Sequence, residues 1–280
     1  MIGKYTLALY ATFAVALAGG TASASAAALA CGDVITDDRK LHADLDCTGH
    51  AGPGVTIGAD GVKLNLNGHT ITGPDDQNGI YAAAKRKRVT IENGAISGYN
   101  HAVEMISGGR DLKLSDLKLT VQDPGGFNSM GIDIGYFRHV RMDHLRIRDA
   151  NYGLFAFENR DLVLRDSRIR AGNATGQTIG ANIDSNTGLV DHVRVKAATY
   201  GFYLSGPTTG FKVTDSVANG GANIGFNIAN TDGPRAYAVK RNTANDNDNY
   251  GFYAAKRVRH SGGNHASGNG VEDCHNLKCV

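Results

Sequence analysis

The chain has 280 residues, of which 37 are glycine and none is tryptophan, and its formal net charge is only +2. A charge this close to zero gives no general attraction to nucleic acid, whose binding depends on clustered cations, so we expect no nucleic-acid partner. Apolar residues come in short alternating bursts, which predicts many short strands and argues against helices.

The first 26 residues have the pattern of an export signal. Lys4 supplies a short positive region, an apolar run extends from Tyr5 to Ala18, and we expect cleavage after the small residues Ala24-Ser25-Ala26. The alternative, a membrane anchor, is disfavoured because the apolar run is short and no later segment reaches about 18 unbroken apolar residues. The sequence therefore predicts a secreted, extracellular protein with no stable membrane insertion.

Four cysteines lie in the mature chain, two near its start and two at its end: Cys31, Cys47, Cys274 and Cys279. Of the three possible pairings we expect the local one, because each disulfide would then constrain one end of a repeat array, where a repeat lacks a neighbour. Metal binding is the alternative, although neither pair has zinc-finger spacing. We expect an N-terminal cap segment at 27–53 and a repeat region with a C-terminal disulfide cap at 54–280.

A phrase of glycine, once alanine, followed by an apolar, a variable and an apolar residue recurs along the repeat region. The nine occurrences begin at Gly54, Gly79, Ala102, Gly131, Gly153, Gly180, Gly201, Gly225 and Gly251. Successive starts lie 21 to 29 residues apart, which is too short for a βαβ unit but suits a coil of three short strands. Two further apolar alternations follow each phrase, as in Val140-Arg-Met142 and Leu145-Arg-Ile147.

These repeats predict an all-β fold, a right-handed, single-stranded parallel β-helix of about nine three-strand coils. Inward apolar residues would stack on their counterparts about 4.8 Å away in neighbouring coils, while the residues between them would face solvent. An antiparallel β-sandwich is the alternative, but hairpin turns at regular spacing would then replace the fixed three-strand phrase. We expect a monomer.

The opening of the mature chain is similar to a known family. Cys31-Gly-Asp-Val-Ile35, Leu45-Asp-Cys47, Val55-Thr-Ile57 and Leu64-Asn-Leu-Asn-Gly-His-Thr-Ile-Thr-Gly73 resemble the start of bacterial secreted right-handed β-helix repeat proteins of the pectate-lyase-like superfamily. Through the repeats, the resemblance covers essentially the whole mature chain. It implies the fold, but it does not select a function, because this architecture hosts lyases, hydrolases, epimerases and non-catalytic proteins.

The variable residue of the phrase forms a column on the first strand of each coil. Its members are Thr56, Tyr81, Glu104, Asp133, Phe155, Asn182, Tyr203, Asn227 and Tyr253. Aromatic rings stack on sugars and polar side chains bind hydroxyls, so Tyr81, Phe155, Asn182 and Tyr203 are candidate substrate-binding residues. The alternative is that β-propensity alone enriches these residues.

Cations form a second column, on the third strand of four consecutive coils. Lys118, Arg146, Arg168 and Arg194 are aligned, with Arg148, Arg170 and Lys196 just beyond three of them. Such a stripe either is a solvated face paired with Asp116, Asp149, Asp166 and Asp191, or binds a polyanion through uronate carboxylates or phosphates. The four aligned cations are candidate substrate-binding residues, and we expect an acidic polysaccharide as partner.

Titratable residues gather on the central coils, where the candidate catalytic residues are Glu104, Asp133, His139, Arg141 and His144. In β-elimination from a uronate, a cation neutralises the carboxylate and a base removes the adjacent proton. Glu104 and Asp133 would hold Ca²⁺, as acidic clusters do in several lyases of the superfamily. Arg141 or Arg146 would face the substrate, and His139 or His144 is an easier base than arginine, whose pKa exceeds about 12.

Hydrolysis by Glu104 and Asp133 as a carboxylate pair is an alternative mechanism. The catalytic strings of related polygalacturonases and epimerases are missing, since no Gly-His-Gly follows Asn230-Thr-Asp232 and Asp123-Pro-Gly-Gly lacks a histidine. His139 and His144 straddle a turn, which argues against a transition-metal site. We expect a protein that acts on or binds uronate-containing polysaccharide, as a lyase if it is an enzyme; a non-catalytic glycan-binding or structural surface solenoid is the alternative.

Overall fold

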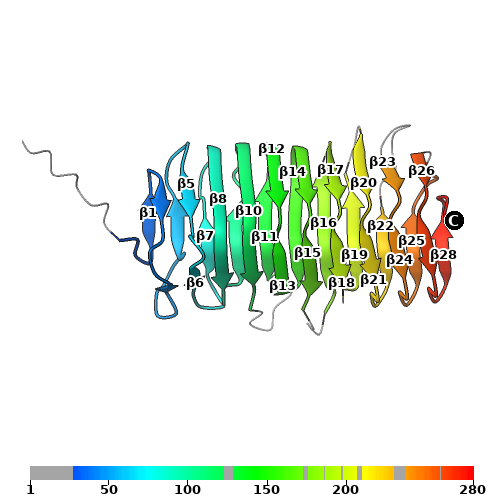
Figure 1. The fold of residues 1–280 in the computed structure, drawn as a ribbon, viewed down its shortest axis with the longest axis horizontal. Helices are drawn as coiled ribbons and strands as arrows, with labels where there is room; N and C mark the ends of the chain where they lie inside the picture. Colours follow the sequence, from blue (N-terminus) through cyan, green and yellow to red (C-terminus); the bar gives the residue numbers. More distant parts are fainter. Residues whose placement is uncertain are drawn as a thin grey trace, which may run out of the picture.

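The computed structural model describes residues 28–122, 129–172, 176–185, 187–196, 198–206, 210–229, 237–258 and 260–280. Within these ranges the regular structure consists of 28 strands and no helix, so no described helix is available to cross a membrane. Figure 1 shows the strands stacked along one long axis, from β1 at the blue end to β28 at the red end. The predicted export signal and the strings at 123–126 and 230–232 lie outside the described residues.

Each turn of the chain contributes to three faces, and every strand pairs in parallel with its counterparts on neighbouring coils. The first face contains β1 (Asp33–Ile35), β4 (Val55–Ile57), β7 (Asn78–Tyr81), β9 (His101–Met105), β11 (Met130–Gly135), the first half of β14 (Tyr152–Arg165), β16 (Ile179–Ser185), β19 (Tyr200–Ser205), β22 (Ile224–Ile228), β25 (Tyr250–Ala254) and β28 (Glu272–His275).

The other two faces follow in the same order along each coil. The second face contains β2 (Arg39–Lys40), β5 (Lys63–Asn65), the first parts of β8 (Arg86–Ser97) and β10 (Gly109–Thr120), β12 (Phe137–Asp143), the second half of β14, β17 (Gly188–Asp191), β20 (Phe211–Thr214), β23 (Tyr237–Lys240) and β26 (His260–Gly262). The third face contains β3 (Leu45–Asp46), β6 (Thr70–Thr72), the ends of β8 and β10, β13 (Arg146–Ala150), β15 (Arg168–Ala171), β18 (Arg194–Lys196), β21 (Val217–Asn219), β24 (Thr243–Asn245) and β27 (His265–Ser267).

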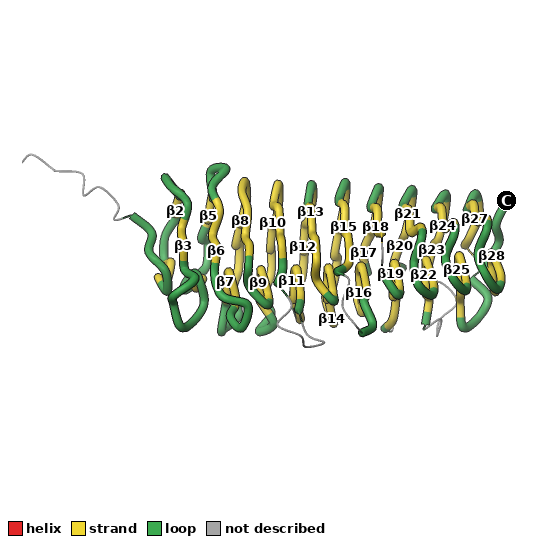
Figure 2. The backbone as a smooth tube through the Cα atoms, turned by 90° about the horizontal axis from the view of Figure 1, so that it is seen from below, coloured by secondary structure: helices red, strands yellow, loops and turns green. Residues whose placement is uncertain are grey.

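This architecture confirms the predicted all-β parallel β-helix of about nine turns. The nine glycine or alanine phrases fall on first-face strands, from β4 to β25. The segment predicted as an N-terminal cap carries β1, β2 and β3, which pair with β4, β5 and β6 in the same parallel arrangement. Figure 2 shows the coils from a second direction as a single stack.

A continuous apolar core runs along the inside of the stack. Inward residues are almost fully buried, and each lies next to the inward residue at the same position of the neighbouring coil, because adjacent coils share one register. Phe202, Phe226 and Phe252 form such a ladder, with ring centroids 4.7 and 4.8 Å apart and planes within 13° of parallel. These spacings match the distance between paired strands, so the rings follow the coil repeat.

The corner between the second and third faces is turned by residues in the left-handed region, which glycine and asparagine usually occupy. Here the residues are mostly charged or imidazole side chains on consecutive coils. They are Asp116, His144, Asp166, His192, Asp215 and Arg241, with φ between 47° and 56°. Their side chains therefore form a row of mixed charge along one edge of the third face, exposed except for the half-buried Asp215.

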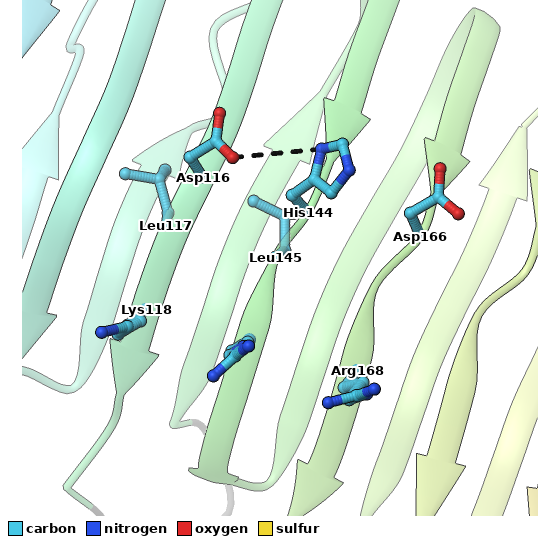
Figure 3. A pocket seen from close by; sticks show the side chains of 8 residues that line it. Asp116, Leu117, Lys118, His144, Leu145, Asp166 and Arg168 are labelled. Carbon is cyan, nitrogen blue, oxygen red and sulfur yellow. Dashed lines mark ion pairs between the residues drawn. The ribbon is translucent and has the colours of Figure 1, made fainter.

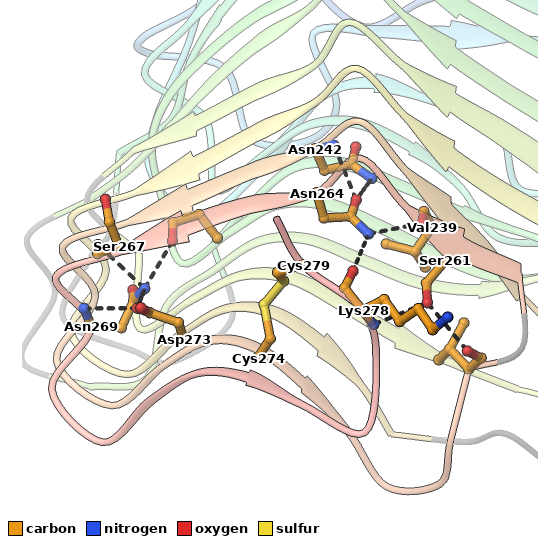
Figure 4. Close-up of a disulfide and its surroundings, with 12 residues drawn as sticks. Val239, Asn242, Ser261, Asn264, Ser267, Asn269, Asp273, Cys274, Lys278 and Cys279 are labelled. Atoms are coloured by element: carbon orange, nitrogen blue, oxygen red, sulfur yellow. Dashed lines mark hydrogen bonds between the residues drawn. A yellow bond between two sulfur atoms is a disulfide. The ribbon is translucent and has the colours of Figure 1, made fainter.

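Both ends of the stack carry the disulfides predicted from the sequence, Cys31 with Cys47 and Cys274 with Cys279. Figure 4 shows the C-terminal disulfide beside a buried asparagine ladder. Asn264 accepts the backbone N–H of Asn242 at 3.1 Å and donates to the carbonyl oxygens of Val239 at 3.0 Å and Lys278 at 3.3 Å. The ladder ties the last segment to the coils before it. Two disulfides are typical of an oxidising compartment.

Candidate functional site

The first-face column forms in the predicted register. Tyr81 pairs with Glu104, Glu104 with Asp133, and Asp133 with Phe155. Phe155 pairs onward with Asn182, and Asn182 with Tyr203. The alignment of candidate residues on this face is therefore confirmed, and it brings Glu104 and Asp133 directly side by side on β9 and β11.

A third side chain, His101, completes a compact cluster with these two acids. The His101 Nδ1 atom lies 2.8 Å from Glu104 Oε2, and the ligand atoms of His101, Glu104 and Asp133 all lie within 4.8 Å of one another. The His101 and Glu104 side chains are 16% and 14% exposed, and Asp133 is 7% exposed. The Oδ1 atom of Asp133 is buried and has no hydrogen-bond partner.

Burial dominates the electrostatics of Asp133. Loss of solvent raises the pKa of this carboxyl to about 6; the Glu104 carboxylate raises it further, and the His101 imidazole opposes the shift. A buried carboxyl without a full set of partners is destabilising, because the charged form has lost its hydration. The charged form of Asp133 therefore lowers the stability of the folded protein.

The other candidate catalytic residues lie elsewhere. On the second face, His139 Nδ1 and Arg141 Nη2 both contact Asp161 Oδ2, at 2.8 and 2.7 Å. The hydrogen bond from Arg141 is the main reason that the pKa of Asp161 is lowered. His144 lies at the next corner, with Nδ1 3.1 Å from Asp143 Oδ1. The structure thus separates the five predicted catalytic residues: Glu104 and Asp133 meet with His101 on the first face, His139 and Arg141 share Asp161 on the second, and His144 lies apart.

His101 belongs to a column three residues before the predicted one, in which Ile179 and Ile224 are buried. This column contains Asn78, His101, Met130, Tyr152, Ile179, Tyr200, Ile224, Tyr250 and Glu272. No single residue type recurs throughout this column, so the repeat alone does not single out His101. The spacing of three residues between His101 and Glu104, with both side chains outward, is the signal that could have found it.

Aromatic residues of the two columns meet on three coils. The ring centroids of Tyr152 and Phe155 are 5.7 Å apart, those of Tyr200 and Tyr203 also 5.7 Å, and those of Tyr250 and Tyr253 5.2 Å. All six residues are half-buried. The aromatic residues Phe155, Tyr203 and Tyr253 of the predicted column therefore each contact a tyrosine that was not predicted from the sequence.

On the third face the cations form two adjacent columns, called here the cationic stripe. Lys118, Arg146, Arg168 and Arg194 are in register, and so are Arg148, Arg170 and Lys196. All seven are exposed, and within the described part of the chain none of them forms an ion pair or a side-chain hydrogen bond.

The acids beside the stripe do not pair with it. Asp116 lies 4.0 Å from His144, whereas Asp191 lies 3.9 Å from Arg165 and 3.2 Å from His192. Figure 3 shows this arrangement around a shallow depression: Asp116, His144 and Asp166 lie in one row, and Lys118 and Arg168 in another. The pairing expected for a merely solvated face is not found among the described residues.

The fold and these surfaces define a parallel β-helix with a cationic stripe on one face and an acid–histidine cluster on another. Comparison with known proteins finds no match: no family model, no curated protein and no solved structure is significantly similar to the chain. The pectate-lyase-like assignment therefore rests on the sequence resemblance alone.

Proposed function

We propose that the protein binds an acidic, uronate-containing polysaccharide along its third face and does so outside the cell. The observation that carries the proposal is the cationic stripe, seven exposed cations in two adjacent columns on β10, β13, β15 and β18 that pair with none of the described residues. The sequence resemblance to secreted β-helix proteins and the two disulfides agree with this location.

The stripe is unfavourable without an anion. Neighbouring like charges about 5 Å apart repel by somewhat under 1 kcal/mol in water, and by more beside a low-dielectric surface. Five of the seven cations are arginines, whose planar guanidinium binds a carboxylate through two parallel hydrogen bonds. A polymer with a carboxylate on each sugar would meet cations on four consecutive coils as it runs along the axis.

Binding fits the geometry better than catalysis. The predicted catalytic residues are divided between faces: Glu104 and Asp133 lie together on the first face, whereas His139 and Arg141 share Asp161 on the second. A polysaccharide held by the stripe lies on the third face, away from those acids. We therefore favour a non-catalytic glycan-binding protein.

The test is affinity electrophoresis of the purified protein through gels containing polygalacturonate, alginate or, as a neutral comparison, dextran. We expect retardation by the acidic polymers only and its loss in the R146A/R168A/R194A variant. The matched control is R110A/R138A/R160A, three exposed arginines aligned on the second face next to Asp111 and Asp161. Both variants lose three positive charges, so equal loss of binding in the two would refute a stripe-specific site.

A further inference from the structure

We propose that His101, Glu104 and Asp133 form a binding site for one divalent transition-metal ion, with Zn²⁺ as the best-fitting ion. The three side chains supply one imidazole nitrogen and two carboxylate oxygens on adjacent strands β9 and β11. Imidazole nitrogen and carboxylate oxygen are both zinc ligands, and a site with three protein ligands keeps the fourth position open for water or another ligand. The site lies on the first face and does not depend on the polysaccharide proposal.

The distances allow one ion to reach all three side chains. The ligand atoms lie within 4.8 Å of one another. In the tetrahedral arrangement that zinc prefers, ligand atoms about 2.0 to 2.2 Å from the ion lie about 3.3 to 3.6 Å from one another. Side-chain rotations that shorten the ligand-to-ligand distances by up to about 1.5 Å would therefore close the site.

Asp133 gives an independent reason to expect a cation. Buried side-chain oxygens in folded proteins almost always have a hydrogen-bond partner. The Oδ1 atom of Asp133 is buried without one, in a residue that is only 7% exposed and that faces Glu104 on the next strand. Two carboxylates and a neutral imidazole around a dication give a site of zero net charge, which removes the repulsion between Glu104 and Asp133.

The donor set suits zinc better than the Ca²⁺ that the two acids alone predict. Calcium takes about six to eight oxygen ligands, whereas imidazole nitrogen suits Zn²⁺, Cu²⁺ or Ni²⁺. Along the column, the residues on either side of the acids are Tyr81 and Phe155, neither of which supplies a carboxylate or carbonyl side chain. Coordination through Nδ1 requires a neutral imidazole with its proton on Nε2, so a protonated His101 releases its Nδ1 proton to solvent when the ion binds, and Nδ1 then donates its lone pair to the metal.

The test is calorimetric titration of the untagged, disulfide-intact protein with ZnCl₂ and with CaCl₂, after dialysis against a chelator. We expect one Zn²⁺ per chain and Ca²⁺ binding at least tenfold weaker, with H101A and D133N each weakening Zn²⁺ binding at least tenfold. The matched control is H192A, since His192 lies with Asp191 and Asp215 in the other cluster that brings ligand atoms together among the described residues. Loss of zinc binding in H192A but not in H101A, or tighter binding of Ca²⁺ than of Zn²⁺, would overturn the proposal.

A second measurement covers the case in which a variant does not fold. X-ray absorption of the zinc-loaded wild-type protein should show one imidazole and two carboxylates around the ion; a shell with no imidazole or with two refutes the site. The R146A/R168A/R194A variant should keep full zinc binding, so failure of this proposal and failure of the polysaccharide proposal are separate results.

Discussion

Asp133 offers the sharpest test of the electrostatics, through the isosteric substitution Asp133→Asn. The pKa of this carboxyl is about 6 in the folded protein against 3.8 as its ordinary value, because the residue is buried next to Glu104. The folded state therefore binds the proton more tightly than the unfolded state does. Stability from this group is fully present below pH 4 and is lost as the pH rises through about 6.

The magnitude follows from the size of the shift. A difference of roughly two pH units, at about 1.4 kcal/mol per unit, gives an upper limit near 3 kcal/mol. Solvent at the rim of the cluster and the coupling to His101 reduce this, so we expect D133N to gain about 1 to 3 kcal/mol over the wild type between pH 4 and pH 8. Asparagine has no carboxyl to ionise, so its own stability lacks this pH dependence.

The assay is guanidinium denaturation at pH 4 and pH 8, followed by circular dichroism with a chelator present so that no metal contributes. The quantity of interest is the difference in the free energy of unfolding between D133N and the wild type, which cancels every other titrating group. If this difference does not change with pH, or if D133N loses stability relative to the wild type as the pH rises, the burial argument is wrong.

Two further predictions concern residues outside both proposed sites. The pKa of Asp161 is lowered, so D161N should be less stable than the wild type at pH 7, by under about 1 kcal/mol because the ion pair with Arg141 is exposed. This loss of stability should disappear as the pH falls through the pKa of Asp161 in the folded protein. A stability difference that does not change with pH in the same denaturation series would contradict the prediction. F226A removes the middle ring of the Phe202–Phe226–Phe252 ladder and should lower the free energy of unfolding by about 3 to 5 kcal/mol in urea denaturation. The control Y136A, at an exposed tyrosine, should lower it far less. Similar losses in the two variants would mean that the ladder is not the source of the stability.

The sequence was enough to predict the columns because a β-helix converts a repeat into a register. Once the glycine phrase is aligned, alternation places every second residue outward and stacking places it next to its counterpart. The pairing of Glu104 with Asp133 and of Arg146 with Arg168 follows from that rule alone. The disulfide pairing was predictable for a similar reason, since the ends of the array are where neighbouring coils are missing.

The grouping of residues around a coil was harder to predict, because it depends on where the chain turns. Tyr136 adopts a φ of 61° between β11 and β12, so Asp133 and His139 lie on different faces although only six residues separate them. The partner of His139 is Asp161, which lies on the following coil and becomes a neighbour only through the register. Titratable residues that are close in the sequence were therefore predicted to form one site, although the corner at Tyr136 puts them on different faces.

The cationic stripe would bind a polyanion through exposed charges, whereas the cluster on the first face would bind a metal ion through partly buried ligands. The two kinds of binding should therefore depend differently on salt concentration. The cationic stripe is exposed, so its attraction for a polyanion is screened as the Debye length falls from about 8 Å at 0.15 M salt to about 3 Å at 1 M. The cluster on the first face would hold its ion by direct coordination from side chains that are at most 16% exposed, where screening is weak. Raising the salt should therefore release the polysaccharide while zinc stays bound, because only the first interaction acts through solvent.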